Sequence, residues 1–121
     1  MIRRSITVLQ LLFLISMGAA GEIKNIGTPY IRNFTKDEYR GGTQSWGAVQ
    51  DARGFMYFAN NDGLLVYDGE QWQLYTMPNR SMVRSVFIDE SGEIFVGAYN
   101  DLGKMVRSEN GEMTFRSLRD L

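Results

Sequence analysis

The chain has 121 residues, about the size of one domain, and its 44% hydrophobic and 22% charged residues are typical of a globular protein. It contains no cysteine and no histidine, which excludes disulfides, cysteine nucleophiles, histidine general bases and metal sites built on thiolate or imidazole. The formal net charge is -1, from 13 basic and 14 acidic residues, and this balance predicts no contact between this segment and nucleic acid.

The first 21 residues have the three parts of a secretory signal peptide. The basic start MIRR is followed by the apolar run ITVLQLLFLI and by the small residues of SMGAAG. A transmembrane anchor is the alternative, but it needs about 20 apolar residues and the run 6–15 is too short. We therefore predict that the protein is exported, with a signal peptide of residues 1–21 cleaved after Ala20 or Gly21.

The rest of the sequence favours β-strands joined by tight turns, because it is rich in glycine and aromatic residues and has only two prolines. A lead-in segment, residues 22–45, precedes eight short runs of aromatic or β-branched residues that alternate with turn signals. The predicted strands are 47–50, 56–60, 64–67, 72–75, 84–88, 94–98, 103–107 and 113–117.

These strands form two copies of one pattern. VQDARGFMYFA aligns with FIDESGEIFVG, which places Asp51 on Asp89 and Gly54 on Gly92 at the same offset. The offset from Asp51 to Asp89 is just below the period of about 40–45 residues of a four-stranded propeller blade. Each copy contains D-x-x-G, which is typical of a type I turn between paired strands.

The predicted fold class is therefore all-β, with two four-stranded antiparallel blades of a β-propeller. The blades are predicted to span residues 46–82 and 83–121. A closed propeller has about four to eight blades, so two blades make an incomplete ring. The chain ends in RSLRDL without a closing segment, and we expect it to be a truncated product or a fragment.

The stretch 27–103 resembles the N-terminal sensor region of Bacteroidetes proteins built from two-component-regulator propeller repeats. The run QDARGFMYFANNDGLLVYDG, followed by PNRSMVRS, carries the resemblance most specifically. In these relatives a triple-tyrosine domain, an inner-membrane span and a LuxR-type or histidine kinase output follow the propeller. The resemblance implies a periplasmic propeller that perceives a small ligand, often a glycan, and regulates transcription together with C-terminal blades and signalling domains that this segment lacks.

Aromatic residues are the first candidates for ligand binding. Trp46, Trp72, Tyr75 and Tyr99 could stack on sugar rings at the mouth of a propeller. The alternative for each is packing in the core or between blades. Tyr99 lies in a predicted loop and is therefore the strongest of the four.

Arg84 is the charged candidate, because it lies at the start of a predicted inner strand. There it would either line the central channel or form a buried ion pair with Asp51 or Asp89. The predicted ligand-binding residues are Tyr99, Arg84 and Trp46.

No residue pattern predicts catalysis, a metal or a cofactor. Asn60, Asn61 and Asp62 lack the spacing of an EF-hand loop and are interpreted as turn residues. The acidic pairs 37–38 and 89–90 are adjacent residues, whereas glycoside hydrolysis needs two carboxyl groups held apart across a cleft.

The leading prediction is therefore a binding module, the sensor propeller of a regulatory protein, and not an enzyme. Two alternatives stay open: the initial blades of a secreted propeller glycosidase or lyase, and an extracellular scaffold or adhesion propeller. The domains encoded downstream would distinguish among the three.

Overall fold

The computed structural model describes residue 27 and residues 29–119, so the predicted signal peptide lies outside the described residues. The chain divides into two compact units, Met1–Arg32 and Asn33–Leu121, and the second contains the fold described here. Its elements are α2 (Lys36–Tyr39), β1 (Ser45–Gln50), β2 (Met56–Asn60), β3 (Gly63–Tyr67), β4 (Trp72–Tyr75), β5 (Val83–Ile88), β6 (Ile94–Ala98), β7 (Asp101–Arg107) and β8 (Met113–Ser117).

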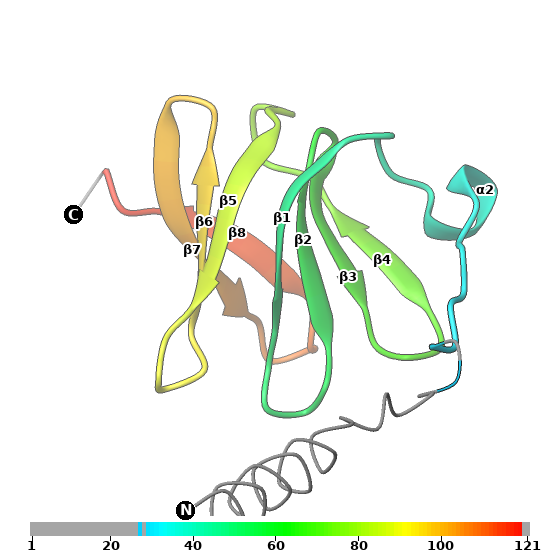
Figure 1. Cartoon of the computed structure of the whole chain (residues 1–121). Helices are drawn as coiled ribbons and strands as arrows, with labels where there is room; N and C mark the ends of the chain where they lie inside the picture. Colours follow the sequence, from blue (N-terminus) through cyan, green and yellow to red (C-terminus); the bar gives the residue numbers. More distant parts are fainter. Residues whose placement is uncertain (1–26, 28, 120–121) are drawn as a thin grey trace, which may run out of the picture. The chain divides into compact units, whose positions relative to one another are not determined.

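The strands form two four-stranded antiparallel sheets, with the orders β1-β2-β3-β4 and β5-β6-β7-β8 (Figure 1). This confirms the predicted fold class, and the two sheets do not close a ring. Four predicted strands have the observed bounds, and the other four begin one or two residues earlier than predicted. In β3 and β7 the reason is the turn length, since pairing continues to Asn60–Gly63 and Ala98–Asp101 on either side of two-residue turns.

The repeated D-x-x-G turn has the predicted form in both sheets. The N–H of Gly54 donates to the carbonyl of Asp51 at 3.0 Å, and Gly92 donates to Asp89 at 3.0 Å. Both glycines have positive φ, +89° and +84°, which side chains with a Cβ rarely adopt. The β7–β8 turn, residues 108–112, has the same hydrogen bond with Ser in place of Asp.

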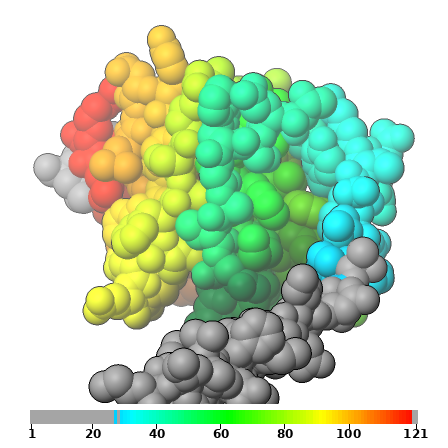
Figure 2. All heavy atoms as spheres, in the orientation of Figure 1, coloured from blue at the N-terminus to red at the C-terminus, as the bar shows by residue number. Residues whose placement is uncertain are grey.

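The hydrophobic core lies between the two sheets, where β1 and β2 pack against β5 (Figure 1). The space-filling view shows the atoms of the two sheets in contact along β1 and β5 (Figure 2). It is built from alternate residues of the strands, as expected when one face of each sheet is buried. Its buried members are Tyr57, Ala59, Leu64, Val66, Met77, Val83, Ile94, Val96, Met105 and Met113.

The lead-in segment covers the opposite face of the first sheet, as a cluster of aromatic rings shows. The ring of Phe34 lies 5.0 Å from those of both Tyr67 and Trp72, and Tyr39 lies 5.9 Å from Trp72. Trp72 also stacks on Tyr67 at 4.5 Å and lies 5.6 Å from Phe58. Trp72 therefore has the packing role that the sequence left as one of two alternatives.

The second sheet has an open face among the described residues. Phe87 and Leu102 are 61% and 56% exposed on it, beside Phe95. The equivalent positions of the first sheet, one repeat earlier, are Val49, Leu64 and Tyr57. Leu64 and Tyr57 are fully buried against the second sheet. The open face thus repeats the face through which the first sheet packs.

Gly63 and Gly69 provide a matched test of backbone crowding in the first sheet. Both have positive φ, but a Cβ on Gly63 would lie 2.3 Å from the carbonyl oxygen of Tyr75, whereas a Cβ on Gly69 would meet nothing within 4 Å. We expect Gly63→Ala to lower the free energy of unfolding by about 1–3 kcal/mol more than Gly69→Ala. Urea unfolding of both variants measures this, and equal losses would contradict the crowding at Gly63.

Candidate functional site

Two β-bulges mark one end of the paired sheets. The register of β1 with β2 shifts between Ser45 and Gly47, and that of β5 with β6 shifts between Val83 and Ser85. The residues within the shifts are Trp46 and Arg84, which the repeat alignment places at equivalent positions of the two copies. A bulge leaves its residue outside the pairing ladder and redirects its side chain, a device common at functional sites.

The two bulge residues contact each other. The guanidinium carbon of Arg84 lies 4.1 Å from the centroid of the Trp46 ring, a cation–π stack. The indole N–H of Trp46 donates to Oδ1 of Asn61 at 2.8 Å, which fixes the plane of the ring. Trp46 stays 42% exposed and Arg84 is exposed, so the stack is available to a ligand.

The alternative of a buried ion pair for Arg84 is wrong. Asp51 pairs with Arg53 at 2.7 Å, and Asp89 accepts hydrogen bonds from Ser91. Both aspartates follow the last residue of an inner strand, whereas Arg84 is near the start of one. Six residues of strand separate these ends by about 17–20 Å, so no pairing is within reach.

Tyr99 lies at the same end of the sheets, in the β6–β7 turn. Its backbone N–H donates to the carbonyl of Met82 at 3.1 Å, just as the N–H of Asn61 donates to Gln44 at 3.1 Å. Tyr99 and Asn61 are therefore equivalent, and Tyr99 is 67% exposed. We call this end, defined by Trp46, Asn61, Arg84 and Tyr99, the bulge end.

Asn61 is the member of the bulge end that sequence reasoning did not assign to a site. Its oxygen orients Trp46, and Oδ1 of its neighbour Asn60 accepts hydrogen bonds from the N–H groups of Gly42 and Asp62. These oxygens are engaged within the protein, as expected for the turn interpretation. Within residues 29–119 no three acidic residues gather in a way that could hold a metal ion.

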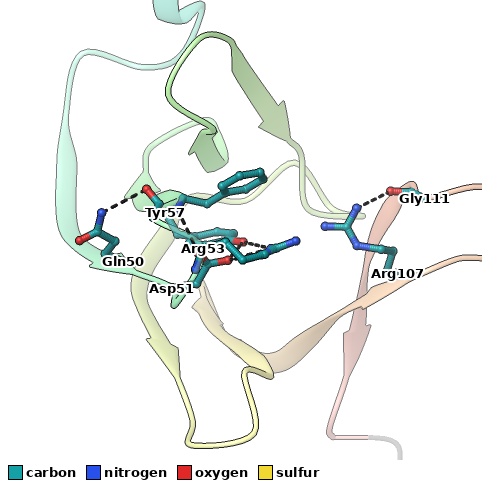
Figure 3. Close-up of polar contacts among 8 residues, drawn as sticks. Gln50, Asp51, Arg53, Tyr57, Arg107 and Gly111 are labelled. Carbon is teal, nitrogen blue, oxygen red and sulfur yellow. Dashed lines mark hydrogen bonds and ion pairs between the residues drawn. The ribbon is translucent and has the colours of Figure 1, made fainter.

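A polar network occupies the other end of the first sheet (Figure 3). The carboxylate of Asp51 accepts hydrogen bonds from the side chain of Arg53, from the N–H of Phe55 and from the hydroxyl of Tyr57 at 2.7–3.0 Å. Burial alone would raise the pKa of Asp51, but these bonds outweigh it and lower the pKa below the ordinary 3.8. Burial and the nearby Asp51 raise the pKa of Tyr57, which therefore remains a neutral donor. A fully engaged carboxylate of this kind stabilises a turn and is not set up as a base.

Comparison of the chain with protein-family models, curated proteins and solved structures found no match. None of the helices in the described part of the chain is long and apolar enough to span a membrane.

Proposed function

We propose that this chain is part of a periplasmic ligand-sensing β-propeller, in a bacterial protein that transmits a signal across the membrane to a transcriptional output. The observation that carries the proposal is the exposed stack of Arg84 on Trp46 at equivalent bulges of neighbouring repeats. An aromatic face beside a guanidinium offers a ligand both apolar contact and charged hydrogen-bond donors.

The open face of the second sheet supports the propeller part of the proposal. Phe87 and Leu102 are exposed at positions equivalent to residues of the sheet–sheet core. A further repeat that packs there would cover these side chains as the second sheet covers the first. Each added repeat would also bring its own bulge residue to the bulge end, so a ring of repeats would surround a ligand with one such residue per repeat.

This arrangement suggests how binding is transmitted. A ligand at the bulge end contacts residues of neighbouring repeats at once, so it binds best when those repeats keep one relative position. Binding therefore favours one packing of the sheets over others, and differential affinity of this kind is what shifts a conformational equilibrium. The domains that the family resemblance implies beyond the propeller would respond to that shift.

Removing the Trp46 ring tests the proposed ligand site in the complete gene product. We expect Trp46→Ala to weaken binding of soluble oligosaccharides by about tenfold or more, because buried tryptophan anchors typically contribute about 2 kcal/mol or more. Calorimetric titration with an oligosaccharide panel measures this effect. The control is Glu90→Gln in the exposed β5–β6 turn at the other end of the sheet, which should keep full affinity.

Unchanged affinity in Trp46→Ala would contradict the assignment of the bulge end as the ligand site. Release of shortened saccharides during the titration would contradict the sensor proposal and support the first alternative, a glycosidase or lyase. Binding that changes no property of the downstream domains would support a scaffold instead.

A further inference from the structure

A cleft of about 660 Å³ lies between the two sheets at the end opposite to the bulges. Its volume is within the range of about 300–1,000 Å³ that is typical of small-molecule sites. Tyr57, Gln73 and Tyr75 line it from the first sheet, and Arg107 and Glu112 line it from the second. Both sheets belong to one compact unit, so residues of this unit alone line the cleft.

The cleft contains two opposite charges that do not neutralise each other. The guanidinium of Arg107 donates to the backbone carbonyl of Gly111 at 3.0 Å (Figure 3). Among the described residues, neither Arg107 nor Glu112 has an ion-pair partner within 4.0 Å. Both charges can therefore be offered to a ligand.

Arg107 and Glu112 both influence the pKa of Tyr75, an aromatic residue that lines the cleft. The pKa of Tyr75 is raised, mainly by burial, while Arg107 lowers it and Glu112 raises it. Both charges are therefore within electrostatic range of the Tyr75 hydroxyl. The phenol of Tyr75 therefore stays neutral and offers a ring face together with a hydroxyl donor.

The charged residues Arg107 and Glu112 are not part of the pattern that the two repeats share. The strand β7 has seven residues, Asp101–Arg107, whereas its counterpart β3 has five, Gly63–Tyr67, and the repeat alignment matches the first residues of the two strands. Arg107 is in the two-residue extension, and Glu112 ends the turn that follows. The equivalent of Arg107 in the first repeat is Gly69, which has no side chain to offer.

We propose that this cleft binds a small zwitterion, a free α-amino acid with an aromatic or aliphatic side chain. Arg107 holds the carboxylate, because the planar guanidinium fork matches a carboxylate with two parallel hydrogen bonds. Glu112 accepts hydrogen bonds from the ammonium group. The ring of Tyr75, which is only partly buried, provides the apolar surface against which the ligand side chain packs.

L-phenylalanine and two analogues test the proposal by calorimetric titration of the complete chain. The analogues are 3-phenylpropionate, which lacks the ammonium group, and phenethylamine, which lacks the carboxylate. We expect L-phenylalanine to bind at least about tenfold more tightly than either analogue, because each lacks a charge-assisted hydrogen bond that contributes more than about 1.4 kcal/mol. Equal binding of all three, or no binding of L-phenylalanine, would overturn the proposal.

Variants of the two charges identify the site. Arg107→Gln and Glu112→Gln are each expected to lose at least about tenfold in affinity for L-phenylalanine. Arg116→Gln is the matched control, because Arg116 is an exposed arginine on the neighbouring strand β8. Retained affinity in Arg107→Gln would contradict the site.

A measurement on the unaltered protein does not depend on the folding of any variant. Addition of L-phenylalanine should shift the amide NMR signals of Gly111 and of the Gln73 side chain, which line the cleft, and leave that of Gly97, on the open face, unchanged. Shifts confined to residues outside the cleft would overturn the assignment.

Discussion

Asp51→Ala is expected to lower the free energy of unfolding by about 2–4 kcal/mol, because it removes the acceptor of a charged and partly buried network. The Asp51 side chain is only 10% exposed, and it accepts bonds from Arg53, from the N–H of Phe55 and from Tyr57. Without it, the hydroxyl of the fully buried Tyr57 keeps only Arg53 as a partner.

Asp89→Ala is the matched control, since Asp89 occupies the same turn position in the second repeat. Its carboxylate accepts bonds from Ser91 and Glu93, which are exposed, and it reaches no buried tyrosine. We therefore expect a smaller loss in Asp89→Ala than in Asp51→Ala. Equal losses would mean that the turn alone, and not the network with Tyr57, carries the stabilisation.

The free energy of unfolding that Asp51→Ala loses should become smaller as the pH falls. The pKa of Asp51 in the folded protein is below its ordinary 3.8, so the carboxylate stabilises the fold fully above that value. The stabilisation disappears as pH falls through the lower folded-state pKa, because the group is then protonated in both states. Urea unfolding at pH 7, 5 and 3 should give equal differences between wild type and Asp51→Ala at the first two pH values and a smaller difference at the third.

The sequence repeat was enough to predict most of the fold, because its turn residues determine the structure of the short stretch of chain in which they lie. The D-x-x-G turns placed the ends of four strands correctly, since a turn of this kind fixes the residues at which pairing begins. Strands β3 and β7 begin earlier than predicted because pairing continues into Gly63 and Asp101, positions that are typical of turns. Strands β1 and β5 begin earlier because pairing resumes beyond a bulge. The packing of Phe34 and Tyr39 on Trp72 was not predictable, because the lead-in segment has no second copy with which to align it.

The sequence predicted which residues belong to the candidate site, but it did not predict how they are arranged in space. The equivalence of Trp46 and Arg84 is contained in the sequence repeat, but their contact depends on two bulges that only the strand register defines. The sequence spacing of Asp51, Arg53 and Tyr57 did not predict the polar network, because it is the position of β2 in the fold that places the tyrosine hydroxyl beside the turn. Arg107 was missed because it belongs to the part of β7 that departs from the repeat.

Asn60→Ala is expected to release the lead-in segment from the first sheet and to lower the free energy of unfolding by about 2–4 kcal/mol. Asn60 is 1% exposed, and its amide accepts from the N–H of Gly42 and donates to the carbonyl of Gly42 and to the hydroxyl of Ser45, at 2.8–3.1 Å. Alanine leaves both polar groups of Gly42 without these partners, in a place where Gly42 itself is buried.

The release can be observed at Trp72, whose ring is covered by Phe34 and Tyr39 of the lead-in segment. In a Trp46→Phe background Trp72 is the remaining tryptophan, so the fluorescence reports the surroundings of this one ring. We expect Asn60→Ala to shift the emission to longer wavelength. Asn61→Ala should leave it unchanged, because the Asn61 side chain bonds to the indole of Trp46 in the wild type and not to the lead-in segment. An unshifted spectrum in Asn60→Ala would show that the aromatic cluster holds the lead-in segment without the amide, and that the two contacts are energetically independent.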